Sequence, residues 1–520
     1  SHQILDYLER TNTFIIPVDD RYGWYRYHRL FGDLLRQRLI QTTGRGRIKA
    51  LHHQASLWFE CNGYMEEAVT HSLAAEEFER AADILQQRVL TSGFCQREIA
   101  RVINWLGKIP ENLILDRPAL CIADAWHQST LKGGEYQIPM QRIEVAQRLL
   151  EQDKHTLSES LVTMREAQIV TLRVILSKQQ RVPWPEVAEL TEHALACVKN
   201  ENNQLRGLLY LNLGQAYLGS GDISSVSYSL AEARRVAGVA GDLATNIWAA
   251  YIQANIIQRQ GRLNEAATTF RQIIQTIKKT AAGANKPAPI SGALYTGLGR
   301  ILLSQNNLAE GERLLHDGIS LLESTHETLL LCDGYFALAR LKSVVGEAEE
   351  TLMLLERVAN LFPGGEVIAE TERVRHWLRS INIDPSALNA VQLWAEEQSL
   401  ELDNMGEIPA IFHEGEWLYD KATTLARVQV ALSRIQGRSN GQGRLEKVLD
   451  FLSQQIHYAK TSGWMERVGE LFILQSVAYD AIEEREQALV SLDQAFKYFE
   501  SHDQLRAFLD EGEAMAGLLY

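Results

Sequence analysis

The chain repeats one spacing of small, large and turn-forming residues four times. In this pattern a small residue stands at the eighth position, an apolar one at the eleventh, a small or apolar one at the twentieth and a large one at the twenty-fourth. The turn residue of the fifteenth position is Gly221, Gly261, Asn306 and Gly346 in the successive copies, at intervals of 40, 45 and 40 residues. Gly and Asn accept the left-handed backbone that ends a helix. A chain with this period is expected to form pairs of helices joined by tight turns.

The small residues determine how the two helices of a pair pack. Gly214 and Gly299 stand at the eighth position of the first and third copies, and Gly311 stands at the twentieth position of the third. Residues without a bulky side chain let two antiparallel helices approach closely. In the fourth copy, Lys342 departs from the pattern at the eleventh position. The spacing is typical of the tetratricopeptide repeat (TPR) and predicts an all-α, TPR-like helical-repeat superhelix, an α-solenoid whose units touch only their neighbours.

The start of the chain follows a different pattern. Residues 1–50 carry nine Lys and Arg against five Asp and Glu, whereas the whole chain has a net charge of −14. Two short alternating runs, Phe14–Val18 and Trp24–His28, predict a β-hairpin, and a helix is expected over Leu30–Leu39. A hairpin followed by a helix is how a winged-helix subdomain ends. The sequence therefore predicts that the superhelix is preceded by the end of a winged-helix subdomain.

Composition excludes several classes of function. A surface with a net charge of −14 repels phosphate, so the chain by itself is not expected to grip nucleic acid. No apolar run reaches the roughly 18 residues that a membrane span requires. The five cysteines have no metal-ligand spacing and are expected to be reduced, buried thiols of a cytoplasmic protein.

Sequence motifs of catalysis are also missing. The chain has no phosphate-binding loop of the form G-x-x-x-x-G-K-[ST] and no G-x-S-x-G motif. His413–Trp417 lacks the second His of a zinc-protease helix. We therefore expect no enzyme activity, no catalytic residue, no metal and no cofactor in this chain.

Binding is the function that remains. A helical-repeat array presents the first helix of each pair along a concave wall. Trp248, Tyr251 and Asn255 form a second stripe beside the packing stripe of their helix, and aromatic faces beside polar tips suit a sugar, a nucleobase or an aromatic ligand. Alternatively, Trp248 and Tyr251 are buried against the next turn of the superhelix. The positions that we assign to the wall are Gln215, Trp248, Tyr251, Asn255, Arg259, Thr296, Arg300, Tyr335 and Arg340.

Three segments resemble one known family. Tyr25–Leu35, Ala55–Ala75 and Phe508–Met515 resemble segments of the large ATP-binding LuxR-type (MalT-like) transcriptional regulators. The first and last of these segments are the more specific, and together they bracket the chain. The family's layout is a signal-transduction ATPase, a winged-helix arm, a helical-repeat sensor and a DNA-binding helix-turn-helix domain.

This resemblance implies a division of the chain into four parts. Residues 1–47 are expected to be the C-terminal part of the arm, and residues 48–160 the helical pairs that link it to the sensor. The TPR-like superhelix is expected over residues 161–380, and the C-terminal helical repeats of the sensor over residues 381–520.

The resemblance also implies a function. The chain is expected to be the sensor region of a transcriptional activator that binds a small-molecule inducer and controls self-association and DNA binding of the full-length protein. ATP or ADP, and DNA, are expected to bind to parts outside this chain, and an inhibitory regulatory protein is a further expected partner. His28 matches a histidine that contacts nucleotide phosphate in related ATPases, although it is equally placed to cap the helix that follows. The alternative function is a TPR-type scaffold for protein–protein interaction.

Overall fold

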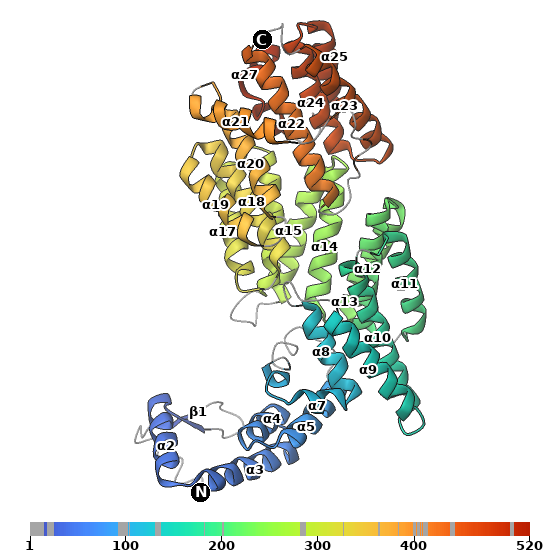
Figure 1. The fold of residues 1–520 in the computed structure, drawn as a ribbon, viewed down its shortest axis with the longest axis vertical. Helices are drawn as coiled ribbons and strands as arrows, with labels where there is room; N and C mark the ends of the chain where they lie inside the picture. The colour runs from blue at the N-terminus through green and yellow to red at the C-terminus, as the bar shows by residue number, and fades with distance from the viewer. Residues whose placement is uncertain are drawn as a thin grey trace. The chain divides into compact units, whose positions relative to one another are not determined.

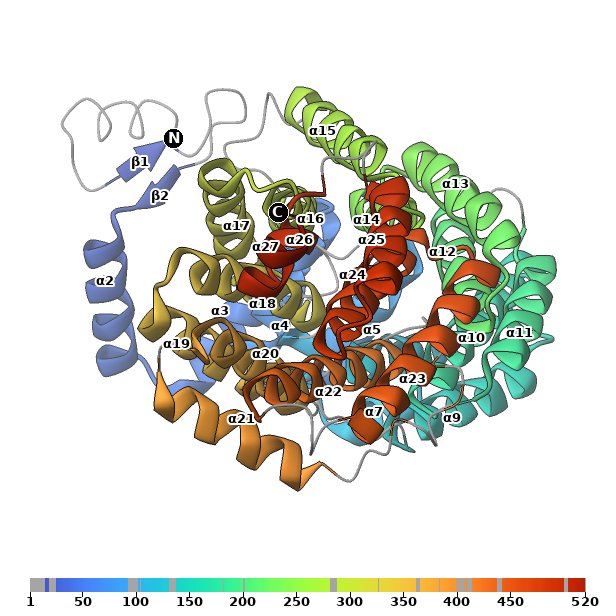
Figure 2. The same cartoon turned by 90° about the horizontal axis from the view of Figure 1, so that it is seen from above.

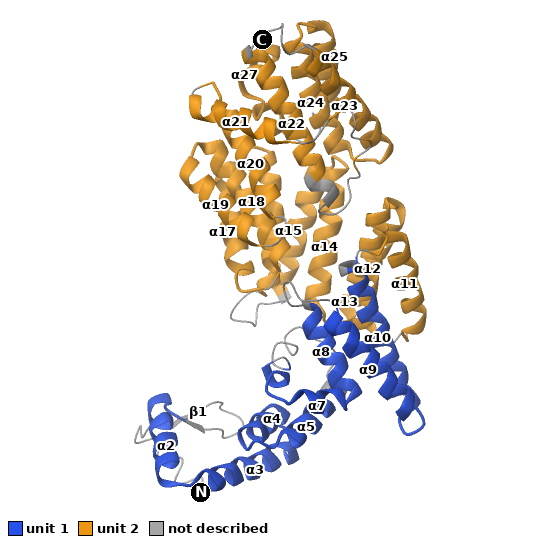
Figure 3. Ribbon diagram, viewed as in Figure 1, with its two compact units in different colours: residues 1–181 blue, residues 182–520 orange. Residues whose placement is uncertain are grey.

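The structure is a computed structural model, and it divides the chain into two compact units, residues 1–181 and residues 182–520 (Figure 3). The description covers all residues except 1–14, 18–24, 92–101, 103, 131–136, 181, 200–201, 281–287, 326, 362–364, 383, 399–401, 403–405, 407, 409–413, 437–441, 500–503 and 520. It is limited to the backbone at 15–17, 25–26, 88–91, 130, 178–179, 280, 414–417, 436 and 442.

The described part of the first unit starts with a hairpin and continues as helices (Figure 1). Its helices are α2 (Arg29–Thr42), α3 (Arg45–Cys61), α4 (Met65–Ala74), α5 (Phe78–Thr91), α7 (Glu111–Leu115), α8 (Pro118–Thr130), α9 (Gln137–Asp153) and α10 (Glu159–Gln179). Buried side chains of α4, α5, α7 and α8 form its core, with Leu85 and Leu120 completely buried.

The predicted hairpin is confirmed. Strands β1 (Ile15–Pro17) and β2 (Tyr25–Tyr27) pair in antiparallel register, with Ile15 opposite Tyr27. The turn between them lies outside the described residues. His28 is exposed at the N-cap position of α2, but its side chain makes no capping hydrogen bond.

The second unit is an array of helix pairs. Its elements are α11 (Trp184–Cys197), α12 (Asn203–Ser220), α13 (Ile223–Ala240), α14 (Leu243–Arg259), α15 (Leu263–Thr280), η1 (Pro289–Ser291), α16 (Gly292–Ser304), α17 (Leu308–Leu322), α18 (Thr328–Val345), α19 (Ala348–Leu361), α20 (Gly365–Ser380), α21 (Pro385–Glu397), α22 (Glu414–Gln436), α23 (Gln442–Thr461), α24 (Met465–Ala481), α25 (Arg485–Phe499), α26 (Arg506–Leu509) and α27 (Gly512–Leu519). Helices α12 and α13, α14 and α15, α16 and α17, and α18 and α19 are the four predicted pairs. The predicted all-α superhelix is therefore confirmed.

Each predicted turn residue has left-handed backbone. The φ angles are 82° at Gly221, 82° at Gly261, 61° at Asn306 and 86° at Gly346. The same device recurs in the last pair, where Glu483 has a φ of 64° between α24 and α25. A side chain is costly in this region of φ, which is why Gly and Asn occupy the fifteenth position of the four predicted copies, whereas Glu483 adopts the same backbone without that advantage.

The small residues bring paired helices into backbone contact. A Cβ atom at Gly299 would lie 2.8 Å from Cγ of Leu315 and 3.1 Å from the carbonyl oxygen of Gly311. At Gly318 it would lie 2.7 Å from the carbonyl oxygen of Gly292. Helices α16 and α17 thus pack at a distance that no larger residue at these positions permits.

The departure at Lys342 also has a structural reason. This side chain is almost completely buried, and its ammonium group lies 2.7 Å from carboxylate oxygens of Glu312 and Glu347 and 3.0 Å from Glu350. A buried ammonium is tolerated when it is paired and hydrogen-bonded. The glutamates come from α17, from the turn after α18 and from α19, so this ionic cluster joins the third and fourth pairs.

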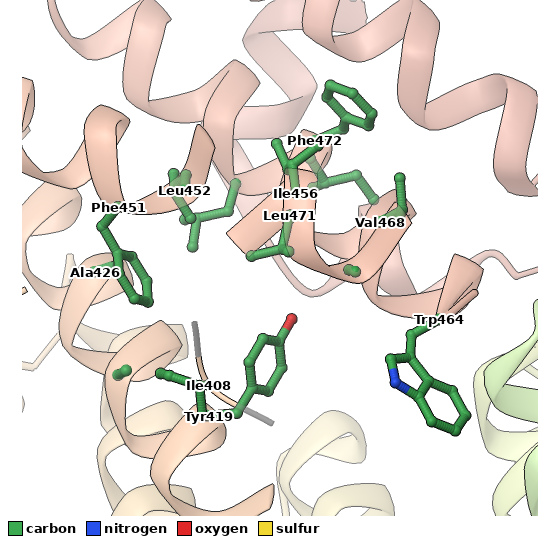
Figure 4. Packing of buried hydrophobic residues seen from close by; sticks show 14 of the residues in the cluster. Ile408, Tyr419, Ala426, Phe451, Leu452, Ile456, Trp464, Val468, Leu471 and Phe472 are labelled. Atoms are coloured by element: carbon green, nitrogen blue, oxygen red, sulfur yellow. The ribbon is translucent and has the colours of Figure 1, made fainter. Parts of the chain in front are cut away.

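The largest core cluster extends beyond the four predicted pairs. Side chains of α22, α23 and α24 such as Tyr419, Leu452 and Leu471 face one another in it (Figure 4). Ile252 and Ile256 of α14 belong to the same cluster. The array therefore continues to α25, and its later helices contact one of its earlier ones.

Two secondary expectations have different outcomes. Cys121 and Cys332 are buried, and burial raises the pKa of each thiol to about 12. Cys61 and Cys197 are exposed at the surface of their helices, so the prediction of burial is wrong for these two. Within the described residues, no helix combines the length and the apolar composition that crossing a bilayer requires.

The packing of α16 on α17 gives the first testable prediction. Gly299→Ala places a methyl group against Leu315 and the backbone of Gly311, so it should lower the free energy of unfolding by about 1–3 kcal/mol. Gly238→Ala is the matched control, because a Cβ atom there meets nothing within 4 Å, and it should be neutral or slightly stabilising. Chemical denaturation of the two variants measures the difference. Equal stability of the two would contradict this account of the repeat.

Candidate functional site

The nine predicted wall residues all lie on the first helices of the four pairs. Gln215 is on α12 and is partly buried. The remaining eight residues are divided among three helices: Trp248, Tyr251, Asn255 and Arg259 on α14, Thr296 and Arg300 on α16, and Tyr335 and Arg340 on α18.

Tyr251 is a buried residue of this set. Its hydroxyl donates a 2.6 Å hydrogen bond to Asp333 of α18. Burial raises the pKa of Tyr251, and the negative charge of Asp333 raises it further. The ring of Trp248 is partly buried and meets Tyr251 edge-on at 6.2 Å. The structure thus favours burial for Tyr251, whereas Trp248 retains some exposed surface.

Two other predicted residues contribute to packing. Thr296 is buried, and its hydroxyl donates to the carbonyl oxygen of Ala293 in the same helix. The hydroxyl of Tyr335 donates to Glu323 at 2.5 Å, and the guanidinium of Arg357 lies over its ring. Their role as ligand contacts stays a prediction, and each already has a partner within the protein.

Asn255 and Arg300 are brought together. The guanidinium of Arg300 donates to the side-chain oxygen of Asn255, and at 3.4 Å to that of Gln258. Gln258 in turn donates at 3.0 Å to the carboxylate of Glu466 on α24, and the same oxygen accepts a 3.0 Å hydrogen bond from Gln504. We call Asn255, Gln258, Arg300 and Glu466 the polar wall. It connects α14, α16 and α24, which are up to 208 residues apart in sequence.

Arg340 belongs to a second group of charges. It lies 3.9 Å from Glu372 of α20 and 3.9 Å from Asp510, and Arg379 lies 3.4 Å from Asp510. Arg375 donates to the almost completely buried Glu372 at 2.9 Å. Burial alone would raise the pKa of Glu372, but Arg340, Arg375 and Arg379 outweigh it and lower that pKa.

Sequence reasoning missed several members of these networks, among them Asp333, Gln258, Glu466 and Asp510. Counted from Ala339 as the eighth position, Asp333 occupies the second position of its repeat and Tyr335 the fourth. Gln258 occupies the twelfth position of its repeat, so a stricter count of wall positions finds both Asp333 and Gln258. Glu466 and Asp510 have no such signal, since they meet the wall only through tertiary folding.

The chemistry of the wall is that of hydrogen bonding and ion pairing. Guanidinium, amide and carboxylate groups offer donors and acceptors. Trp248, whose ring contacts Tyr251, is a partly exposed aromatic residue about two turns earlier on the same helix as Asn255. Across the described ranges, no three His, Cys, Asp or Glu side chains are grouped so that they could hold a metal ion. The arrangement can therefore orient a bound molecule with polar groups.

Comparison with known families decides the classification. The family described as the MalT-like TPR region matches residues 166–520, which is more than half of the chain. The chain belongs to the MalT-like family. The MalT winged helix domain also matches residues 1–47, which confirms the winged-helix end predicted from the hairpin. The four-part division of the chain stays a prediction.

The curated relatives of this MalT-like chain are regulators. It is 26% identical over 522 residues to the HTH-type transcriptional regulator MalT of Yersinia enterocolitica, and 24% identical over 522 residues to that of Yersinia pestis strain Pestoides F. Each match covers 99% of this chain and 54% of the relative. The chain thus spans about half the length of the curated relatives that it matches.

Solved structures offer only a distant likeness. A Rap protein complexed with competence and sporulation factor aligns over 86% of this chain and 99% of its own, with 11% identity and a TM-score of 0.36. The apo form of RapI aligns over 81% and 98%, with 11% identity and a TM-score of 0.35.

The polar wall predicts a pH dependence of stability. Burial, together with the nearby negative charge of Glu470, raises the pKa of Glu466 to about 7, against the lowering effects of Gln258 and Arg300. Because the folded pKa lies above the ordinary value of 4.5, the contribution of Glu466 to stability is complete below that value. This contribution is lost as the pH rises through about 7.

The substitution Glu466→Gln keeps a side-chain oxygen that accepts hydrogen bonds from Gln258 and Gln504, and it removes the titratable carboxyl group. The variant should therefore melt at a higher temperature than the wild type at alkaline pH and at the same temperature at mildly acidic pH. Thermal melts across this range measure the difference, with Glu486→Gln on the exposed surface of α25 as the control. A lower melting temperature for Glu466→Gln at alkaline pH would show that the carboxylate is favoured here.

Proposed function

We propose that this chain is the sensor region of a MalT-like transcriptional regulator and that it binds a small-molecule inducer at the polar wall. Binding controls the self-association and DNA binding of the full-length protein. The family assignment supports the regulatory part of this proposal. The observation that carries the ligand site is the connected polar wall, in which Asn255, Gln258 and Arg300 join two first helices of the array.

The chemistry of the wall indicates a class of ligand. Amide and guanidinium groups such as those of Asn255, Gln258 and Arg300 recognise hydroxyl, carbonyl or ring-nitrogen acceptors. Trp248 is partly exposed about two turns before Asn255 on the same helix and offers an aromatic face. A small polar molecule with one apolar face fits both features, and sugars, nucleobases and aromatic ligands all belong to this class.

An inducer acts through a difference in affinity. It shifts the equilibrium between two states of the array only by the ratio of its affinities for them. The hydrogen bond between Gln258 and Glu466 joins α14 to α24. A ligand that accepts hydrogen bonds from Gln258 or Arg300 therefore weakens the contact between α14 and α24. In this way binding at the polar wall can change the curvature of the array.

The remaining parts of the proposal concern the full-length protein. ATP or ADP binds to its nucleotide-binding part, with His28 as a phosphate contact, and DNA binds to its helix-turn-helix part. The exposure of His28 and the absence of a capping hydrogen bond from its side chain support this role. We propose that this chain itself is not an enzyme, that an inhibitory protein is a further partner, and that the regulator acts in the cytoplasm, where its DNA is.

A thermal-shift screen tests the ligand site. An inducer present at about 100 times its Kd should stabilise the chain by about 2.7 kcal/mol and raise its melting temperature by a few degrees. Trp248→Ala should abolish this shift. Tyr228→Ala, on the exposed surface of α13, should leave the shift unchanged.

Two outcomes would contradict the proposal. One is that no metabolite in a broad screen changes the melting temperature while Trp248→Ala leaves the inducer response of the full-length regulator intact. The other is that only a peptide or a regulatory protein binds, since this would favour the scaffold function instead.

A further inference from the structure

The C-terminal segment of the chain lies inside the array of helices. Figure 2 shows α26 and α27 near α16, α18 and α24, and the first and last of these contact α26. We call Gln504–Leu519 the strap. It follows α25, and its two helices have only four and eight residues. Helices this short are not stable alone in water, so the strap depends on its contacts for its structure.

The polar contacts of the strap reach several helices and turns of the array. Asp510 lies 3.4 Å from Arg379 of α20 and 3.9 Å from Arg340 of α18, and Glu511 accepts a 2.8 Å hydrogen bond from Arg427 of α22. Two further contacts join Gln504 to Glu466 of α24 at 3.0 Å and Arg506 to Asn306 after α16 at 3.4 Å. In addition, Glu513 accepts a 3.2 Å hydrogen bond from Asn382, and the carbonyl oxygen of Gly517 accepts one of 3.0 Å from Arg485 of α25.

Charge explains why an acidic pair stands here. Burial alone would raise the pKa of Asp510, but Arg379, Arg340 and Arg506 outweigh burial and lower it. Both carboxylates are mostly buried, with 20% and 11% of the side chain exposed in Asp510 and Glu511. A guanidinium that loses its carboxylate inside a protein is strongly unfavourable, so these contacts hold the strap in place.

Apolar contacts anchor the rest of the strap. The ring of Phe508 stacks on Phe496 of α25 with 4.9 Å between centroids. Met515 and Leu518 are almost completely buried in the largest core cluster. The strap is therefore a docked element with one charged and one apolar attachment.

The docked state is not fully satisfied. Within the described atoms, Gln504 Oε1, Arg379 Nε and Arg506 Nε are buried without a hydrogen-bond partner. Each unpaired buried group costs free energy that solvation recovers on release. The docked strap is thus less stable than its ion pairs alone indicate, which is the property that a releasable element requires.

The strap is connected to the polar wall. Gln504 and Gln258 donate to the same oxygen of Glu466, and Gln258 also accepts from Arg300. One run of hydrogen bonds therefore leads from Arg300 to the first residue of the strap. A change in the partners of Gln258 alters the group that holds Gln504.

We propose that the strap is a releasable latch, held by Asp510 and Glu511 in the arginines of α18, α20 and α22, and that occupation of the polar wall releases it. The latch itself rests only on the contacts of the strap. Its release by a ligand rests on the proposed function. Release frees a segment that spans several helix pairs, so it changes both the curvature of the array and the position of the chain end.

Hydrogen exchange of the 520-residue chain tests the latch without any ligand. In Asp510→Asn/Glu511→Gln, amides of the strap should exchange about tenfold faster or more, while those of α14 and α16 change little. Asp493→Asn/Glu486→Gln removes the same charge from the exposed surface of α25 and should leave exchange unchanged. Unchanged strap exchange in the first variant would overturn the latch, as would an equal increase throughout the second unit.

Exchanging the charges of Arg427 and Glu511 distinguishes loss of this ion pair from general misfolding. Arg427→Glu alone should release the strap, and Arg427→Glu/Glu511→Arg should restore most of its protection. Failure of the exchanged pair to restore any protection would overturn the claim that this ion pair holds the strap.

A ligand experiment separates the latch from the proposed function. The metabolite that gives the largest thermal shift should raise strap exchange in the wild type but not in Trp248→Ala. If that metabolite binds and the strap stays protected, release by ligand is wrong, whereas the proposed function stands. If no metabolite binds but Asp510→Asn/Glu511→Gln frees the strap, the latch stands and the proposed function fails.

Discussion

The close approach of the two helices within a pair, as in α16 and α17, is the constraint on which the rest of this structure depends. A single helix pair cannot bury its apolar face, so the pairs must stack. They stack regularly only if the two helices of each pair lie close together. Gly299, Gly311 and Gly318 let the backbones of α16 and α17 come into contact. Left-handed turns at residues such as Gly221 and Asn306 then reverse the chain at a fixed point in each repeat. Every later feature follows from this stacking, because it places the first helices next to one another.

Stacking also creates a requirement for polar pairing. Side chains that point from one first helix toward another lose contact with water, so their charges and hydrogen bonds must be satisfied by residues far away in sequence. Asn255, Gln258 and Arg300 satisfy one another and Glu466, and Glu372 is neutralised by arginines of α18 and α20. The strap adds Asp510 and Glu511 to this set. The first helices of the array thus share a network of mutually dependent contacts. Such a network is suited to sensing, because a bound molecule that replaces one hydrogen-bond partner alters several other hydrogen bonds and ion pairs.

The periodic features of this molecule could be predicted from the sequence, and the tertiary ones could not. The four turn residues and the close-packing glycines have local causes, so their spacing reveals them. Lys342 breaks the pattern, and nothing near it in sequence except Glu347 and Glu350 indicates the cluster that accepts it. Tyr335 is aromatic and polar like a wall residue, but its place in the repeat directs it to Glu323 instead. The role of Asp510 depends on Arg340 and Arg379, which are more than 130 residues away, and resemblance to a family marks the segment without giving its position.

The central claim is that the polar wall and the strap form one network, and a double-mutant cycle tests it most directly. Gln258 and Asp510 share no hydrogen bond or ion pair among the described contacts, and a path of hydrogen bonds leads from Gln258 through Glu466 to Gln504 at the start of the strap. Unfolding free energies of Gln258→Met, Asp510→Asn and the double variant give their coupling energy. The account predicts a coupling of about 0.5 kcal/mol or more, whereas additivity within about 0.3 kcal/mol would contradict it.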